Sequence, residues 1–500
     1  MEIDAARVER QLNPLLFGMH IEWVQDGQHL LDPALPELRP AVLGLLRPLR
    51  IPLFRFPGGI HADYYDWRLG VGPPQERGES RNVFTGKRER HRFGTPELLQ
   101  LLEATGGEAL ITANYGTGTA GEAAAWARYF ASAGVSPRFW EIGNEIYLSG
   151  PRTEGPNGRR IYHPPEQYAR DFTRYRDEIR DVLPRAQVGI IAYSDQGAFP
   201  LAPPESRGWS ERMLRVLTGR ADFVAVHTAY APVILDDSVD LADREVRLQV
   251  YRSLYSAALQ ARDGILAVAR AVDRLSPGNR GIPIAVTELG PLFGISARPD
   301  RHAAYVDQTR TLAAALYVAS VLDVLIGEPR VEIACYTNPT HPWYGSLITD
   351  TREGLVKTPT YHLYALYRSR FARQIVWSKV ASPSFDAPGV GLVRARTRIP
   401  DLIVRASVDD RGRKLTAMLV NRSETRTLAA TLELQHFTPR TVDCRILAAP
   451  SPAAINGRGL TRSTLSGGRE IAPRPFPCAA GRPIRLDLPP SSILSLVAER

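Results

Sequence analysis

Short apolar runs alternate with amphipathic stretches along most of this chain of 500 residues. Such an alternation is typical of parallel strands that are connected by helices. It predicts eight strands, over Pro14–Glu22, Leu53–Gly59, Glu108–Tyr115, Arg138–Glu145, Gln187–Ser194, Asp222–Tyr230, Ile282–Gly290 and Val331–Asn338. Eight strand–helix cycles fit a (β/α)8 TIM barrel. An open doubly wound sheet is the alternative, but it usually needs a glycine-rich phosphate turn after its first strand, and Gly18–Glu22 (GMHIE) is not one.

Helices are predicted between these strands. In Pro164–Leu183, Tyr168, Phe172, Tyr175 and Ile179 recur at three- and four-residue steps, which places them on one helical face.

A second helix is predicted over Thr95–Thr105, with Thr95 as its N-cap, Pro96 in the first turn and glycines after its end. The most apolar stretch, Leu312–Gly327, contains Asp323 and is shorter than the roughly 20 residues of a membrane helix. It is therefore predicted to be a buried helix.

The pattern changes after about Ser369, where the helical periodicity ends and short β-rich runs begin. These runs are Leu402–Val408, Lys414–Asn421, Thr427–Leu434, Val442–Leu447 and Ile484–Leu488. Asp409–Gly412 (DDRG) reads as a hairpin turn between the first two. We therefore expect a catalytic barrel over residues 1–370 and an antiparallel β-sandwich over residues 371–500, which the first few residues could join.

Composition limits the other classes of protein to which the chain could belong. Three cysteines, Cys335, Cys444 and Cys478, cannot form a disulfide framework and match no common zinc pattern, so neither disulfides nor a metal is expected to hold the fold. No cofactor is expected either. Met1–Arg10 lacks the apolar segment of a secretory signal, which indicates a cytoplasmic protein.

The net charge of +9 raises the question of an acidic partner. One basic cluster stands out, at Lys87, Arg88, Arg90, His91 and Arg92, but no nucleic-acid-binding motif accompanies it. A solvated loop is the better interpretation. Neither a nucleic acid nor a membrane is an expected partner.

Two predicted strands end in glutamate. Glu145 closes the fourth and Glu288 closes the seventh. Reacting groups of TIM-barrel enzymes lie at the carboxyl ends of the strands. Either glutamate alone could belong to an ordinary ion pair, but two such ends can bring a pair of carboxylates together, at the separation of about 5–5.5 Å that retaining glycoside hydrolysis requires. Glu141, four residues earlier in the fourth strand, is expected to point into the barrel or its wall.

Several motifs resemble glycoside hydrolase family 51 of clan A, most of whose members are α-L-arabinofuranosidases. They occur in the family's order along most of the chain: Phe54–Gly59 (FRFPGG), Tyr65–Trp67 (YDW), Gly70–Pro73 (GVGP), Phe93–Glu97 (FGTPE), Asn114–Thr119 (NYGTGT), Trp140–Glu145 (WEIGNE) and Lys357–Tyr361 (KTPTY). The resemblance implies that Glu145 is the acid/base and Glu288 the nucleophile.

The same resemblance implies roles for further residues. It assigns Asn144 to the sugar 2-hydroxyl, Glu22 to sugar binding and Arg55 to a place beside the nucleophile, where a cation keeps a carboxylate ionised. His227 and Tyr230 fall where clan A enzymes place ring side chains near the nucleophile, although ordinary packing at the rim would also explain them.

Departures from the family pattern concern the sugar-binding positions. Ile60 and His61 follow the two glycines where the family has asparagine, and Leu289 rather than tryptophan follows Glu288. Trp343 could provide a stacking platform near the end of strand eight, together with the adjacent Tyr344. Reaction class is therefore better determined than substrate.

We expect a retaining exo-α-L-arabinofuranosidase acting on plant-type oligosaccharides. A clan A β-glycosidase, endo-β-glucanase or xylosidase is the second expectation. A non-catalytic carbohydrate-binding protein is the alternative of another class. The resemblance also implies a homo-oligomer, a hexamer in this family.

Overall fold

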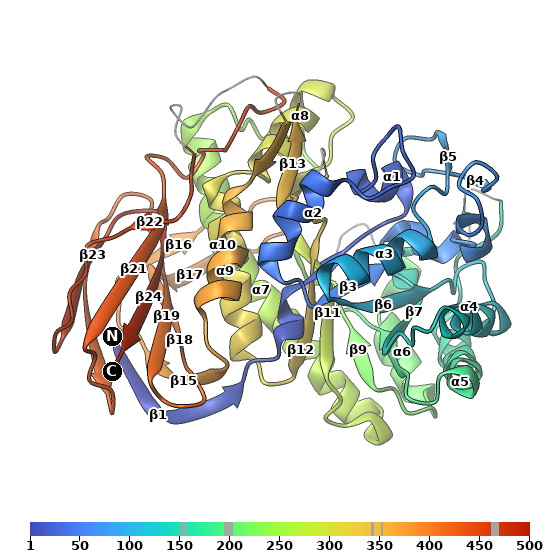
Figure 1. Ribbon diagram of the computed structural model, residues 1–500, viewed down its shortest axis with the longest axis horizontal. Coiled ribbons are helices and arrows are strands. Elements are labelled where there is room, and N and C mark those ends of the chain that lie inside the picture. Colours follow the sequence, from blue (N-terminus) through green and yellow to red (C-terminus); the bar gives the residue numbers. More distant parts are fainter. Residues whose placement is uncertain (151–153, 156–157, 195–203, 342–344, 352–353, 462–469) are drawn as a thin grey trace.

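The computed structural model describes residues 1–150, 154–155, 158–194, 204–341, 345–351, 354–461 and 470–500. Its larger unit is a closed barrel of eight parallel strands, which confirms the predicted fold class (Figure 1). The strands, in barrel order, are β2 (Gly18–His20), β3 (Leu53–Phe56), β6 (Glu108–Ala113), β7 (Phe139–Ile142), β8 (Gln187–Ile191), β9 (Phe223–Ala225), β11 (Ile284–Gly294) and β12 (Val331–Thr337). The pairing of β9 with β11, at Val224 and Ile284, closes the ring.

The sixth predicted strand differs from the prediction. Asp222–Tyr230 is not continuous, because the chain leaves β9 after Ala225 and resumes as β10 (Ala229–Ile234), which pairs with the second half of β11. His227 therefore lies in the gap between two short strands. The extra length of β11 is explained by these successive partners, β9 and β12 first and β10 afterwards.

Most of the described helices lie around the outside of the barrel, whereas residues of α1 and α8 line the cleft described below. The described helices are α1 (Val24–His29), α2 (Pro40–Leu46), α3 (Thr95–Thr105), α4 (Ala120–Ser132), α5 (Pro165–Val182), α6 (Trp209–Val216), α7 (Arg244–Leu275), α8 (Pro299–Gln308), α9 (Leu312–Gly327) and α10 (Pro359–Arg370). The apolar face predicted for the α5 region is buried, as periodicity requires.

The predicted cap of α3 was wrong by one residue. Gly94 is the N-cap, and its N–H donates to the Glu97 carboxylate at 2.8 Å. The Thr95 hydroxyl instead accepts from the Trp126 indole at 2.9 Å.

The apolar helix predicted over Leu312–Gly327 is α9, and nearly all of its side chains are buried. It contacts barrel strands β11 and β12 on one side and strands of the second domain on the other. A helix that is covered on both sides has no polar face, which explains its uniform apolar character.

The second domain is one mostly antiparallel sheet of nine strands, drawn mainly in orange and red beside the blue first strand (Figure 1). In sheet order they are β22 (Arg474–Pro475), β21 (Thr441–Ala448), β24 (Ser492–Glu499), β19 (Lys414–Asn421), β18 (Leu402–Val408), β15 (Gln374–Lys379), β1 (Glu2–Gln11), β20 (Leu428–Gln435) and β23 (Ile484–Leu488). One apolar cluster collects side chains from both halves of the sheet, as in a β-sandwich. The N-terminal strand β1 belongs to this sheet and connects directly to the barrel.

Three small hairpins complete the described strands: β4 (Glu79–Arg81) with β5 (Arg88–Arg90), β13 (Ile348–Thr351) with β14 (Gly354–Lys357), and β16 (Ser384–Ala387) with β17 (Arg396–Pro400). The basic cluster includes β5, the second strand of the first hairpin, and is only partly a solvated loop. His91 is buried and stacks on Trp23 with ring centroids 3.8 Å apart, and Arg92 forms an ion pair with Asp26 at 2.9 Å.

The expectation of a fold without disulfides was wrong. Cys444 and Cys478 are bonded to each other, because the segment that contains β22 lies against β21. Their spacing of 34 residues gives no sign of this contact. Cys335 is a free, buried thiol in β12. Among helices in the described ranges, none has both the length and the apolar composition that crossing a bilayer requires.

Candidate active site

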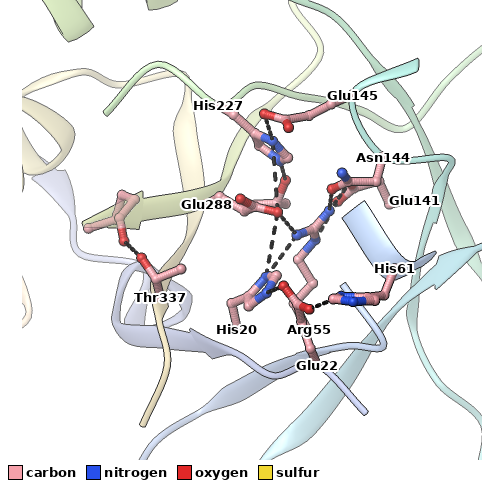
Figure 2. A network of polar contacts seen from close by, with 12 residues as sticks. His20, Glu22, Arg55, His61, Glu141, Asn144, Glu145, His227, Glu288 and Thr337 are labelled. Atoms are coloured by element: carbon pink, nitrogen blue, oxygen red, sulfur yellow. Dashed lines mark hydrogen bonds and ion pairs between the residues drawn. The ribbon is translucent and has the colours of Figure 1, made fainter. Parts of the chain in front are cut away.

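Glu145 and Glu288 converge above the carboxyl ends of the barrel strands (Figure 2). Glu288 lies within β11, whereas Glu145 follows β7 and precedes a single 3-10 turn over Ile146–Leu148. One carboxylate oxygen of each glutamate and one ring nitrogen of His227 all lie within 4.8 Å of one another. This arrangement suits a retaining reaction, which needs carboxyl groups about 5–5.5 Å apart.

Glu288 is surrounded by hydrogen-bond donors. Arg55 Nη1 lies 2.6 Å from its Oε1, and the Tyr230 hydroxyl donates to its Oε2 at 2.8 Å. His20 Nδ1 and His227 Nδ1 lie 3.7 and 4.0 Å from Oε1. Burial alone would raise the pKa of Glu288, but the charges of His227, His20 and Arg55 and the bond from Tyr230 hold it well below its usual range.

Arg55 connects Glu288 on β11 to strand β7. Its side chain is fully buried at the end of β3 and contacts both oxygens of Glu141 in β7, at 2.7 and 3.3 Å. It also donates to Asn144 Oδ1 at 2.7 Å and lies 2.9 Å from His20 Nδ1. Burial would lower the pKa of Arg55, but Glu141 and Glu288 raise it. The expectation that Glu141 points into the barrel or its wall is confirmed, since it is fully buried and forms an ion pair with Arg55.

Glu145 has fewer partners than Glu288. His227 Nδ1 lies 2.9 Å from Glu145 Oε1, while the other ring nitrogen of His227 lies 2.9 Å from the Thr287 hydroxyl. The Glu145 side chain is 20% exposed, against 9% for Glu288. Its backbone has a left-handed φ of 48°, which is unusual for a residue with a side chain and typical of functional positions.

Glu22 forms the opposite side of the site. It forms hydrogen-bonded ion pairs with His61 and with His20, whose Nε2 lies 3.5 Å from its Oε1. Burial would raise the pKa of Glu22, but His61 and His20 lower it to about 2. The chain then turns through left-handed φ angles over residues 25–28, and Gln28 Oε1 accepts from the Glu22 N–H at 3.2 Å. This turn fixes the backbone of Glu22.

Asn144 has one half of its amide free for a ligand. Its Oδ1 accepts from Arg55, while its Nδ2 is buried and forms no hydrogen bond with the described residues. A buried donor without a partner is costly unless a ligand completes it.

A cleft of about 540 Å³ opens above these groups. Glu22, Glu145, Tyr230 and Glu288 line it. Further out it is lined by Ile60, Phe84 and Ile295, which are 44%, 59% and 45% exposed. Trp343, the predicted stacking residue, lies outside the described residues.

Glu145, His227 and Glu288 offer atom types that metal ions bind. However, the Arg55 guanidinium already contacts Glu288 at 2.6 Å, so an ion on that carboxylate would face a fixed positive charge. The donor set is better suited to proton transfer and to attack by a carboxylate.

The structure thus brings together Glu22, Arg55, Asn144, Glu145, His227, Tyr230 and Glu288. Sequence reasoning missed His20 and His61 as members of the network. His20 could have been found, because it lies two residues before Glu22 and alternation places both on one face of an extended segment. His61 gave no signal beyond its position after Gly58 and Gly59.

A closed barrel with one carboxylate on its seventh strand and another just after its fourth is the arrangement of a glycoside hydrolase of the (β/α)8 class. Two family models match the chain, the α-L-arabinofuranosidase 1 domain over residues 45–133 and the α-L-arabinofuranosidase C-terminal domain over residues 293–492. Together these two models match more than half of the chain, so it is an α-L-arabinofuranosidase-like protein, and solved family 51 α-L-arabinofuranosidases share its fold.

Comparisons with individual relatives agree with these family models. The chain is 25% identical to the intracellular exo-α-L-arabinofuranosidase of Bacteroides ovatus, over 69% of this chain and 66% of that protein. It is 22% identical to the intracellular exo-α-(1→5)-L-arabinofuranosidase of Streptomyces lividans, over 95% and 71%. The solved structure of a family 51 α-L-arabinofuranosidase from Bifidobacterium longum superposes with a TM-score of 0.79 at 19% identity, over 100% of this chain and 99% of that one.

Proposed function

We propose that this protein is a retaining exo-α-L-arabinofuranosidase that acts on arabinose-containing oligosaccharides of the plant type. The observation that carries the proposal is the asymmetric pair of glutamates within 4.8 Å of each other. Arg55 and Tyr230 keep one of them ionised, and the other contacts His227, a group that can exchange a proton with it. The names of the relatives support the choice of sugar.

In the first step, a Glu288 oxygen forms a bond to the anomeric carbon while the bond to the leaving-group oxygen breaks and Glu145 donates its proton to that oxygen. In the second step, Glu145 removes a proton from water, whose oxygen displaces Glu288 from the anomeric carbon. Each step inverts the anomeric centre, so the overall reaction retains its configuration.

The remaining predicted residues bind the sugar or hold the glutamates in place. Asn144 Nδ2 would donate to the 2-hydroxyl, and Glu22 would accept hydrogen bonds from other sugar hydroxyls. Arg55, His227 and Tyr230 act through the two glutamates, and Trp343 would stack on the substrate.

A clan A β-glycosidase or endo-acting β-glucanase or xylosidase is the second candidate. Ile60 favours it, because it places an exposed apolar side chain in the cleft where the family has a polar residue. A pocket that lacks one polar contact can favour a different sugar.

The test compares hydrolysis of aryl α-L-arabinofuranoside, aryl β-D-xyloside, aryl β-D-glucoside and a soluble β-glucan. We expect the arabinofuranoside to be the best substrate and Glu288→Ala to lower its kcat/KM by at least about 10⁴-fold. Glu108→Ala is the matched control, because Glu108 pairs with Arg138 at the start of β6, away from the site. A preference for β-glucan would overturn the substrate but not the mechanism. Inertness of the wild type on the whole panel would favour a carbohydrate-binding protein.

The acid/base assignment has its own test. Glu145→Ala should regain turnover on an activated aryl arabinofuranoside when azide is added, because azide needs no base to attack the glycosyl-enzyme. The product should be a glycosyl azide of retained configuration. Absence of this product would contradict the role of Glu145.

We also propose a cytoplasmic location, supported by the word intracellular in the names of two relatives, and a homo-oligomer such as a hexamer. The Cys444–Cys478 bond is less usual in that compartment. Cell fractionation with a count of free thiols tests the location, and light scattering tests the assembly.

A further inference from the structure

Asp63 is a buried carboxylate outside the network described above. It lies in the 3-10 turn Ile60–Tyr64 that follows β3, and its residue is only 3% exposed. In the described part of the chain, no lysine, arginine or histidine forms an ion pair with it. A charged group in such a position needs another source of stabilisation.

Backbone N–H groups from two neighbouring barrel strands provide it. Asp63 Oδ2 accepts from the N–H of Asn144 at 2.9 Å, directly before the acid/base glutamate. Its Oδ1 accepts from Tyr115 and Gly116 at 3.3 and 3.1 Å, in the segment after β6. The two oxygens therefore bridge the ends of β6 and β7.

We propose that Asp63 is a positioning residue that sets the orientation of Asn144 and Glu145 for proton transfer, an inference that rests on the proposed acid/base role of Glu145. Glu145 has a left-handed backbone, and Gly143, two residues before it, has a φ of 78°. The left-handed conformation of Glu145 is unfavourable for a residue with a side chain and persists only when its surroundings fix it. Asp63 fixes the peptide group between Gly143 and Asn144.

The same short turn also reaches the other side of the site. His61, two residues before Asp63, holds the Glu22 carboxylate. The turn therefore connects the proposed sugar-binding carboxylate to the proposed acid/base segment through two of its own side chains, His61 and Asp63. A shift of this turn would move both.

The groups that face Asp63 are Glu141 in β7, Tyr64 in its own turn, and Tyr168 and Tyr175 on α5. Burial raises the pKa of Asp63 to about 7, although three backbone N–H donors lower it. None of these neighbours provides a compensating positive charge. The backbone donors are therefore the main stabilising contacts of the ionised form.

Asp63→Asn tests the proposal, because the amide keeps the shape but has only one acceptor oxygen. The full-length variant is assayed on two α-L-arabinofuranosides, a methyl glycoside whose departure needs a proton and a 2,4-dinitrophenyl glycoside whose departure does not. We expect kcat/KM for the methyl glycoside to fall about 10- to 100-fold, with a change of less than about threefold for the activated one. Asp171→Asn is the matched control, since Asp171 accepts from the Tyr115 hydroxyl at 3.0 Å but contacts no backbone group of the acid/base segment.

Equal losses on both substrates, or none on either, would overturn the positioning role while leaving the proposed function intact. A wild type that cleaves neither glycoside would instead refute the function, and Asp63 would then position no acid/base. Should Asp63→Asn not fold, Asp63→Ser is measured in the same way. If neither variant folds, Asp63 is a residue of the fold alone and the inference is wrong.

Discussion

The two halves of the active site hold their carboxylates in different ways. Glu288 accepts hydrogen bonds from Arg55 and Tyr230, lies near two histidines and sits on a long, paired strand. Glu145 contacts one histidine, is about twice as exposed and follows the end of a strand. One carboxylate is thus fixed in place and kept ionised, whereas the other has fewer contacts and is more exposed to solvent.

This contrast corresponds to the two chemical tasks. A nucleophile must be ionised whenever substrate arrives, so a pKa far below its usual range is useful. An acid/base group must give up and regain a proton in each cycle, so strong fixation of its charge would be harmful. The surroundings therefore distinguish the roles of two residues that are chemically identical.

The largest loss of kcat should come from replacing Arg55, the cation that contacts Glu288. Arg55→Met leaves Glu288 and Glu141 buried without their partner, so we expect kcat to fall by about 10³-fold or more, measured on an aryl glycoside. The free energy of unfolding should fall by about 3–5 kcal/mol, measured by denaturant titration.

Arg77→Met is the control for that change. Arg77 forms a buried ion pair with Glu97 outside the cleft, at 2.7 Å. It should lose comparable stability but keep its kcat per folded molecule. An equal loss of kcat in both variants would contradict a specific role for Arg55.

A smaller effect is expected from Tyr230→Phe, which removes one donor to Glu288. The pKa of Glu288 is depressed in the folded protein, so losing a donor moves it upward and protonates the nucleophile at a higher pH. The acid limb of the kcat/KM profile should rise by about one pH unit, with kcat/KM at its optimum lower by roughly tenfold. Tyr317→Phe, which removes a buried hydroxyl that donates to the Ala229 carbonyl at 2.7 Å, should leave the limb in place. An unmoved limb in Tyr230→Phe would show that its hydroxyl does not control the nucleophile.

The two halves also differ in how well the sequence predicted them. The barrel and Glu288 could be predicted from the sequence, because β11 is a continuous apolar run and the glutamate that interrupts it is conspicuous. Glu145 was predicted from the end of β7, but its contact with His227 depends on the break between β9 and β10. That break reflects a change of partner strand, which no local pattern records.

Long-range contacts explain the other differences. The bond between Cys444 and Cys478 exists because β22 pairs with β21, and His61 meets Glu22 because β2 pairs with β3. Gly94 rather than Thr95 caps α3, because the Glu97 carboxylate can reach the Gly94 N–H and the Thr95 hydroxyl is taken by Trp126. In each case the residue type is known from the sequence, but its role depends on a tertiary contact.

The smallest effect should come from His227→Gln, which removes the imidazole that lies near both carboxylates. Burial would lower the pKa of His227, but Glu288 and Glu145 raise it, so the imidazole holds a proton to higher pH than usual. Its charge in turn lowers the pKa of Glu288. Without the imidazole, the pKa of Glu288 should rise, so the acid limb of kcat/KM should move to higher pH by about one unit, while kcat/KM at its optimum falls by less than about threefold. His362→Gln, on α10, is the control and should leave the acid limb in place. An unmoved acid limb in His227→Gln would mean that the His227 charge does not act on Glu288.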